Sequence, residues 1–467
     1  MERKEAMTKK KAVLLLGLVM TVVSGWWVTR NGSLAQPQED VLDVWTTWAG
    51  DADQLQAVFD RYTQATSLPV NVTTGVDARQ VSKALSGSTP PDVVVLSTAD
   101  PVGSYHAKGL VEPLAPWIEA ADVDLDDVYP APLARCETED GDYACLPWGC
   151  DAYALFWNKR LFEAAGLDPE RPPRTMEELA AYADTLTVRD ESGEITQIGF
   201  LPDFPRSNTD LYLRMFGGAW YGDGADALAV DAPPAVDALT WQRQFFGGRD
   251  GDTLEAFVES LNYYTKSTHA LYAGRRLSCQ ECHRGAPASD RKLPGSGFYD
   301  GRVAMMVGGE WQVGPHHIPR RRPDLDYGVA PFPPPSDHPE RANTTVVRGP
   351  VAVIPARVAD KEAAATLLAW MTSPEIVADV SHANASLPTS RRAAEDPRFG
   401  QIPNFDVFLD MLADPNATSV TTSRISAELN EALRAIEGEL LHEGSGDPAA
   451  LLNAVQTEFS VALKERK

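Results

Sequence analysis

Short apolar strands that alternate with amphipathic helices constrain the fold of this chain more than any other feature. Val41–Thr46 predicts a buried strand, and apolar residues then recur at helical spacing from Asp51 onward. Val70–Thr73 and Val81–Leu85 repeat the alternation. Asp92–Leu96 is a compact apolar segment of the kind that lies in parallel sheets. Successive strand–helix units of this kind predict a doubly wound α/β lobe.

The same alternation continues past the middle of the chain. Ala152–Trp157 predicts a strand that leads into a helix over Lys159–Gly166. Thr175–Glu178 has the sequence of a capping box and opens another helix, and Gln197–Leu201 returns to a strand. A chain of 467 residues exceeds the size at which one hydrophobic core keeps growing. We therefore expect two lobes.

The second half of the sequence contains an inserted loop and a helical end. Residues 266–297 are basic and rich in Arg, Ser, Gly and Pro, which interrupts the α/β pattern. Val346–Pro355 predicts a strand and Lys361–Met371 a helix, while Ser373 and Pro374 have the residue types of a helix cap and first helical residue. Apolar residues in helical register begin at Ile425 and predict C-terminal helices.

The first 35 residues have the pattern of an export segment. Met1–Lys11 is basic, and Ala12–Val28 is continuously apolar. Ser33–Ala35 has small residues at the positions that a signal peptidase reads, so cleavage before Gln36 is one interpretation. The apolar segment is also long enough for an uncleaved membrane anchor, and both interpretations stay open. Either places the protein outside the cytoplasm, in the periplasm or at the cell surface.

The charge of the chain disfavours nucleic acid as a partner. Lys and Arg number 42 against 66 Asp and Glu, which gives a net charge of -24. A surface this acidic repels phosphate backbones and anionic lipid.

Export makes disulfides admissible, and the cysteines offer one clear pair. Cys136 and Cys145 flank an Asp-Gly turn signal, which predicts a hairpin closed by a cross-strand disulfide. Cys150 is then left over or pairs elsewhere. Within the inserted loop, Cys279 and Cys282 are followed by His283, the attachment pattern of c-type haem. A local disulfide or a zinc site would fit these residues as well, and we expect neither cofactor nor metal.

Tryptophans beside glycines suggest the ligand class. A sugar site needs flat aromatic rings for C–H faces and planar polar groups for hydroxyl edges. Trp48, Trp148, Trp220 and Trp311 each lie within a few residues of Gly, where a side chain can reach a cleft. Any one of them alone is equally well explained by packing.

An ordered set of segments resembles the family 1 extracellular solute-binding proteins, the group that includes maltose-binding protein. The resemblance covers the chain from Val41 onward. It is carried by the order of Val41–Trp48, Pro91–Val94, Gly109–Leu114, Leu146–Trp148, Tyr153–Lys159, Phe216–Gly218, Phe298–Met306 and Ala369–Glu375.

This resemblance implies the architecture of a type II periplasmic binding protein, with two doubly wound lobes joined by a multi-crossing hinge. The N-lobe would comprise residues 36–146 and 349–395, and the C-lobe residues 147–348 and 396–467. It further implies a monomeric receptor that binds a sugar or short oligosaccharide between the lobes and delivers it to the membrane permease of an ABC importer.

The resemblance also assigns candidate ligand contacts. Asp100 corresponds to an acidic residue of the N-lobe that holds sugar hydroxyls, Asp151 to a cleft carboxylate beyond the hinge strand, and Trp311 to a stacking aromatic. Because Pro101 follows it, Asp100 could instead cap a helix. The remaining candidates are placed by segment alone: Trp48, Trp148, Trp220, Tyr221, Glu310 and Arg348.

Two other functions compete with this interpretation. The same fold could bind a non-sugar solute such as a polyamine, since fold does not determine ligand. A secreted enzyme could cleave glycosidic bonds with paired carboxylates. The sequence contains no Gly-x-Ser-x-Gly, no His-Glu-x-x-His and no phosphate-binding glycine loop, so we expect no catalysis.

Overall fold

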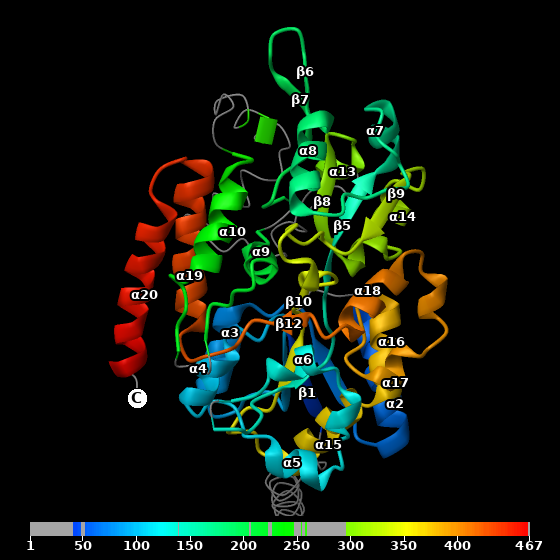
Figure 1. Cartoon of the computed structure of the whole chain (residues 1–467). Coiled ribbons are helices and arrows are strands. Elements are labelled where there is room, and N and C mark those ends of the chain that lie inside the picture. The colour runs from blue at the N-terminus through cyan, green and yellow to red at the C-terminus, as the bar shows by residue number, and fades with distance from the viewer. Residues whose placement is uncertain are drawn as a thin grey trace, which may run out of the picture.

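The computed structural model consists of two α/β lobes, each built around a five-stranded sheet and stacked one above the other in Figure 1. The predicted two-lobed α/β fold is confirmed. The structure describes residues 41–465 except for 48–51, 139, 205–206, 223–226, 247–253, 255–256 and 259–295. The predicted export segment at 1–35 lies outside the described residues, and so does the inserted loop at 266–297 apart from its last residues.

The N-lobe sheet has the strand order β2-β1-β3-β11-β4. β1 (Leu42–Thr46) pairs in parallel with β2 (Val70–Thr73) and β3 (Val93–Leu96). β11 (Val351–Val353) pairs antiparallel with β3 and with β4 (Leu146–Pro147). The strands of the C-lobe sheet lie between β4 and β11 in sequence. The N-lobe sheet therefore combines four strands that precede the C-lobe sheet with one that follows it.

Local sequence explains why the N-lobe elements form. All residues of β3 are buried, as expected for a strand covered on both faces. The Asp77 carboxylate accepts the backbone N–H of Gln80, and the Gln80 side-chain oxygen accepts the backbone N–H of Asp77, so α3 (Ala78–Ser86) begins with a complete capping box. The helices of this lobe are α2 (Ala52–Thr66), α3 (Ala78–Ser86), α4 (Val102–Ala107), α5 (Ala115–Ala120), α6 (Pro130–Ala134), α15 (Lys361–Met371), α16 (Pro374–Asn384) and α17 (Arg391–Ala394), with a 3₁₀ turn η1 (Leu125–Asp127).

The C-lobe sheet has the order β6-β7-β8-β5-β9. β5 (Tyr153–Asn158) pairs antiparallel with both β8 (Val303–Gly309) and β9 (Tyr327–Ala330). β7 (Ile195–Phe200) is parallel to β8 and antiparallel to β6 (Val188–Arg189). Every residue of β5 and β8 is buried, so their continuous apolar composition reflects burial on both faces and not the direction of pairing.

The C-terminal helices complete the C-lobe. α19 and α20 pack against each other, and α20 packs on α10, so their apolar residues enter the same core as β5 and β8. The helices of this lobe are α7 (Lys159–Ala164), α8 (Met176–Leu186), α9 (Thr209–Met215), α10 (Pro233–Arg243), α13 (Ser296–Tyr299), α14 (Ile318–Arg321), α18 (Phe405–Ala413), α19 (Ser426–Glu437) and α20 (Pro448–Glu465), with shorter turns η2 (Glu310–Val313), η3 (Pro339–Arg341), η4 (Phe399–Gln401) and the π-helical η5 (Gly438–His442).

Crossing segments join the lobes. One leads from β4 to β5, and a second from β10 (Thr345–Val347) to β11. An isolated bridge between Asp151 and Arg348 ties these two segments, and another between Cys150 and Leu387 ties the first of them to the chain that follows α16. β10 also pairs in parallel with β12 (Ala417–Ser419). The backbone of several chain segments is thus hydrogen-bonded within the junction.

Local predictions failed where tertiary structure competed with sequence pattern. Val346–Pro355 is not one strand: β10 and β11 lie in different sheets, because Gly349 adopts a φ of 112° and turns the chain between them. Ser373 is the N-cap residue of α16 and Pro374 its first residue, as predicted, although the Ser373 hydroxyl donates to the Trp370 carbonyl and makes no capping bond to the first turn. Thr175 does cap α8, whereas the Glu178 carboxylate turns to the Arg174 N–H and leaves the capping box half made.

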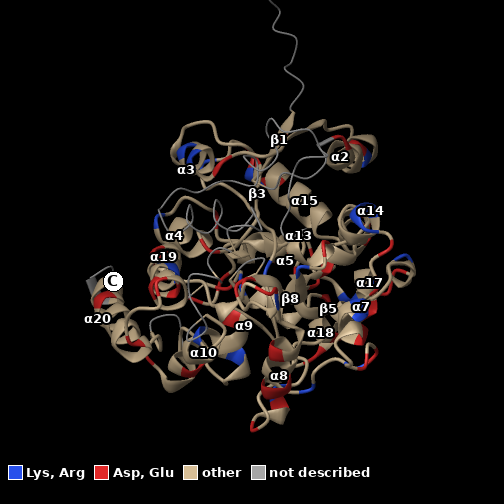
Figure 2. Cartoon of the chain, turned by 90° about the horizontal axis from the view of Figure 1, so that it is seen from above, with Lys and Arg blue, Asp and Glu red and all other residues tan. Residues whose placement is uncertain are grey.

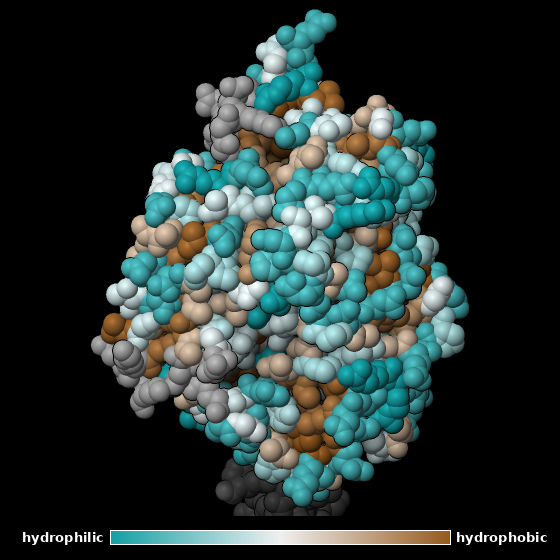
Figure 3. All heavy atoms as spheres, in the orientation of Figure 1, coloured by the Kyte–Doolittle hydropathy of each residue, from teal (hydrophilic) through white to brown (hydrophobic). Residues whose placement is uncertain are grey.

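Along the ribbon in Figure 2, Lys and Arg residues are dispersed among Asp and Glu residues. In Figure 3, apolar areas are separated by hydrophilic atoms. Among the described residues, no helix combines the length and apolar character needed to cross a membrane. No cluster of His, Cys, Asp and Glu side chains in the described ranges could hold a metal ion. Cys279, Cys282 and His283 lie outside those ranges.

The predicted hairpin between Cys136 and Cys145 is present. Glu137 and Tyr143 form an antiparallel bridge, and the Ala144 N–H donates to the Cys136 carbonyl at 2.9 Å. Both cysteines, and Cys150 as well, are buried and free in the structure. Burial, together with a hydrogen bond to Cys136, raises the pKa of Cys145 well above its ordinary value. The two thiols are therefore side by side without the disulfide, and their pairing stays a prediction.

We expect oxidation to join Cys136 and Cys145 in the exported protein. A disulfide closing a loop of about ten residues stabilises a fold by roughly 2–3 kcal/mol. Denaturant unfolding with and without reductant should show this loss, and the double variant Cys136→Ser/Cys145→Ser should not respond to reductant. A wild-type protein with the same free energy of unfolding in both conditions would contradict the pairing.

Candidate functional site

An arginine, an aspartate and a tryptophan meet where the C-lobe approaches the hinge. Arg348, just after β10, forms an ion pair with Asp210 in the first turn of α9. The same carboxylate accepts the indole N–H of Trp220 at an N···O distance of 2.5 Å. Burial is the largest single effect and lowers the pKa of Arg348, but the negative charges around it, Asp210 first, together outweigh burial, and the pKa of Arg348 is raised. The guanidinium is therefore a fixed, paired cation.

Aromatic side chains extend this group along the C-lobe sheet. The guanidinium carbon of Arg348 lies 5.9 Å from the ring centroid of Tyr153. Tyr153 in turn meets Trp311 edge to face, with centroids 5.7 Å apart and an interplanar angle of 86°. Trp311 is only partly buried. Trp311 is thus a partly exposed indole that is supported by the ring of Tyr153.

A neighbouring glycine fixes the position of this indole. Trp311 follows the end of β8, and a Cβ atom on Gly309 would lie 2.0 Å from the indole ring. Any side chain at position 309 would therefore displace the ring. The absence of one lets the indole lie directly over the strand end.

The hinge brings two carboxyl groups together. Asp151 and Arg348 exchange backbone hydrogen bonds of 3.0 and 3.1 Å. Glu310 is fully buried beside them and accepts the N–H of Ala152 at 3.0 Å. Burial, and then the negative charge of Asp151, raises the pKa of Glu310 well above its ordinary value. Glu310 thus keeps its proton to a higher pH than an exposed glutamate does, in contact with the crossing strand.

The N-lobe reaches the same region from the other side. Asp100 is close enough to act on the charge of Arg348. It does not cap α4, since Pro101 occupies the cap position and makes no side-chain bond there. Nearby, the Tyr221 hydroxyl is 2.8 Å from the Ser423 hydroxyl. Side chains from both lobes therefore border one junction.

Comparison with known proteins identifies the family. Residues 57–406 match the family described as bacterial extracellular solute-binding protein. The chain belongs to this family. The resemblance inferred from the ordered segments is confirmed, and membership of an extracellular family agrees with the predicted export.

Individual relatives of this solute-binding protein are distant. It is 23% identical to the maltotriose-binding protein of Pyrococcus abyssi over 325 residues, which are 68% of this chain and 59% of that protein. The match thus spans less than two thirds of the relative's length. The structure of CpMnBP1 with mannotriose bound has a TM-score of 0.69 at 22% identity, covering 90% of this chain and 99% of the other. UgpB of Mycobacterium tuberculosis in complex with glycerophosphocholine has a TM-score of 0.67 at 20% identity, covering 91% and 98%. These structures share the fold.

The predicted ligand contacts of the solute-binding protein differ in their placement. Trp48 lies outside the described residues. Trp148 is 1% exposed and packs in the N-lobe core, a placement that favours packing over ligand contact. Glu310 is equally buried and supports the hinge. The other candidates meet at the junction: Asp100, Asp151, Trp220, Tyr221, Trp311 and Arg348. Of these, Trp220 and Tyr221 are 4% and 5% exposed and pack in the C-lobe core, so their placement also favours packing over ligand contact.

Two residues of the junction escaped the sequence analysis. Asp210 stands in the first turn of a helix, where an acidic residue is ordinarily explained by the helix dipole. Tyr153 begins a fully buried strand and looks like a core residue. Neither position carries a local signal, since their roles arise from contact with Arg348, which is distant in sequence.

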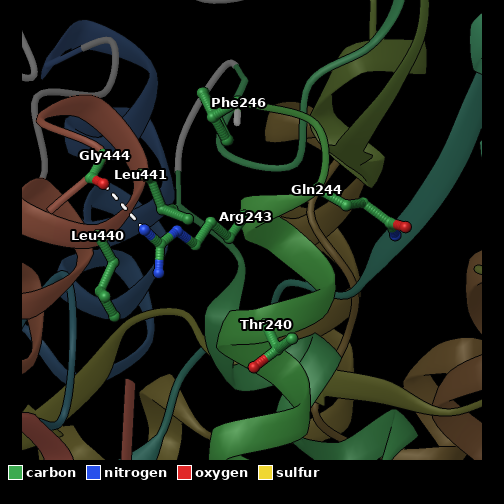
Figure 4. A pocket seen from close by; sticks show the side chains of 7 residues that line it. All are labelled: Thr240, Arg243, Gln244, Phe246, Leu440, Leu441 and Gly444. Carbon is green, nitrogen blue, oxygen red and sulfur yellow. Dashed lines mark hydrogen bonds between the residues drawn. The ribbon is translucent and has the colours of Figure 1, made fainter. Parts of the chain in front are cut away.

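A separate hollow of about 480 Å³ lies on the C-lobe between α10 and η5 (Figure 4). The Arg243 guanidinium spans it and donates to the carbonyls of Gly444 and Gly446 at 2.8 and 3.0 Å. None of its lining residues is a predicted ligand contact. The hollow is thus distinct from the lobe junction.

The raised pKa of Glu310 predicts a pH dependence of stability. The folded state keeps a proton that the unfolded chain releases above its ordinary pKa of about 4.3, so the free energy of unfolding falls as pH rises beyond that value. Glu310→Gln should remove this loss, by up to about 1.4 kcal/mol per pH unit. Denaturant unfolding at pH 4 and 7 measures it, with Glu191→Gln on an exposed loop as the control. If the free energy of unfolding depended equally on pH in wild type, Glu310→Gln and Glu191→Gln, the fold would not raise the pKa of Glu310.

Proposed function

We propose that this chain is the receptor of an ABC importer, and that it binds a sugar or short oligosaccharide between its lobes and presents it to the membrane permease. The observation that carries the proposal is the partly exposed Trp311 indole held beside a paired Arg348–Asp210 group. Family membership, the mannotriose-bound structure and the maltotriose-binding relative support it.

The chemistry of the junction suits a sugar. The Trp311 ring offers an apolar face for the C–H side of a pyranose. Asp100, Asp210 and Arg348 offer planar acceptors and donors for the hydroxyl edges. Because Asp210 and Trp220 already hold each other, this polar edge is preorganised and loses little freedom when a ligand binds.

Charge separates sugars from the other ligand class among the structural relatives. A glycerophosphodiester carries an anionic phosphate, which requires an available cation. Arg348 is already paired with Asp210, and Asp100 and Asp151 add negative charge near it. A neutral ligand avoids both the repulsion and the cost of breaking a partly buried ion pair.

A receptor of this kind performs no chemistry on its solute. Lobe closure around the ligand would create the surface that the permease recognises, driven by the greater affinity of the closed form for the solute. A monomer, exported to the periplasm or retained at the cell surface by its N-terminal segment, satisfies this role. Neither haem nor zinc at Cys279, Cys282 and His283 is required for it.

A thermal-shift panel tests the proposal directly, because a ligand that binds only the folded state raises the melting temperature. The panel contains maltotriose, mannotriose, glycerophosphocholine and spermidine. We expect a shift with a trisaccharide and none with glycerophosphocholine, with the sugar recovered intact. A shift with spermidine alone would identify a polyamine receptor, and consumption of the sugar would identify an enzyme.

Replacement of Trp311 should weaken sugar binding without unfolding the protein. We expect Trp311→Ala to raise the Kd at least tenfold, about 1.4 kcal/mol, because the stacking face is lost. Trp311→Phe should retain most of the affinity. Isothermal titration calorimetry measures both.

The matched control is Trp370→Ala. This indole packs against Phe59 and Tyr62 in the N-lobe core, away from the junction. Its loss should lower stability and leave the Kd unchanged. Equal affinity of Trp311→Ala and wild type would remove Trp311 from the site.

A further inference from the structure

A glycine lies at one of the points where the lobes touch. Gly103, the second residue of α4 in the N-lobe, lies against the main chain of Ser423 in the segment before α19. A Cβ atom at position 103 would stand 2.6 Å from both the carbonyl carbon and the carbonyl oxygen of Ser423. Such distances are sterically forbidden, so the present approach of α4 to this segment exists only because residue 103 has no side chain.

The C-lobe side of the contact is held firmly. The Ser423 hydroxyl pairs with the Tyr221 hydroxyl at 2.8 Å, and the Ser423 N–H donates to the Ser426 hydroxyl at 2.7 Å. Ser423 is only 2% exposed. The atoms that face Gly103 are backbone atoms, which cannot rotate away as a side chain could.

The adjacent residue binds the N-lobe directly. Thr422 donates its hydroxyl to the Arg135 carbonyl at 3.0 Å. Arg135 is itself buried and donates to the Gly349 carbonyl at 2.7 Å, at the hinge crossing. The contact at Gly103 is thus continuous with the hinge through Thr422 and Arg135.

The glycine is not required by its own backbone. Gly103 is absent from the glycines with positive φ, so alanine or valine could adopt its conformation. Within the part of the chain that the structure describes, the atoms nearest to a Cβ at this position all belong to Ser423, so packing against Ser423 is what requires the glycine.

We propose that Gly103 is the closing contact of this receptor: α4 meets the Ser423 segment only when the lobes come together around the solute, and a side chain at position 103 holds them apart. The inference rests on the proposed function, and it adds a positioning residue that touches no ligand. A ligand that binds the closed state loses affinity in proportion to the cost of reaching that state.

The test compares Gly103→Ala and Gly103→Val with a matched pair at Gly400. Gly400 is exposed, does not have a positive φ, and has open space where a Cβ would lie. Calorimetry gives the Kd for maltotriose and mannotriose, and small-angle X-ray scattering gives the radius of gyration with and without each sugar. Melting temperatures of the ligand-free proteins report whether the fold is intact.

We expect Gly103→Ala to raise the Kd by about tenfold and Gly103→Val by more, since each methyl group enlarges the gap. Ligand-induced compaction should shrink in the same order, while the ligand-free melting temperature stays at the wild-type value. Both Gly400 variants should behave as wild type.

Distinct results separate this inference from the function on which it rests. If Gly103→Val binds sugar and compacts as wild type does, the closing contact is overturned. It is also overturned if the ligand-free melting temperature of Gly103→Val falls so far that unfolding alone explains the lost affinity. If wild type binds neither trisaccharide, the sugar proposal fails. The contact is then tested with the solute of the thermal-shift panel that does bind: smaller ligand-induced compaction of Gly103→Val than of wild type supports it, and equal compaction overturns it.

Discussion

Arg348 holds the lobe junction together because its backbone and its side chain bind different elements. Its backbone pairs with Asp151 on the crossing strand, and its guanidinium pairs with Asp210 on α9 and lies beside the Tyr153 ring. A partly buried cation is stable only while its partner stays in place, since a lone buried charge costs several kcal/mol. The strand, the helix and the aromatic support of Trp311 are therefore fixed relative to one another by one residue.

Two glycines shape this junction as much as its charged residues do. Gly309 leaves room for the Trp311 indole, and Gly349 turns the chain from one sheet into the other. Backbone atoms crowd Gly349 and the Trp311 ring crowds Gly309, so a side chain at either position would displace its neighbours. The glycine at position 309 permits this placement of the indole, and the edge-to-face contact with Tyr153 supports it.

The sequence predicted those elements whose stability is local. β1, β3 and α15 have strong apolar periodicity and lie where expected, and the ordered segments identified the family. The site was predicted less completely. The role of Asp210 depends on its ion pair with Arg348, which is distant in sequence. Trp148 lies near a glycine, as Trp311 does, but it packs in the N-lobe core. Periodicity describes one element at a time, whereas the junction is defined by contacts between elements.

The same pairing gives a physical account of solute choice within one fold. Related structures bind mannotriose or glycerophosphocholine on a shared architecture, so the scaffold itself does not discriminate between them. Under the proposed function, we attribute discrimination to which charges at the junction are already neutralised. Here Asp210 neutralises Arg348 before any solute arrives, and Asp100 adds a carboxylate from the opposite lobe. An anion would have to displace Asp210 and leave that carboxylate without its cation, whereas a neutral polyol can accept and donate hydrogen bonds without separating the pair.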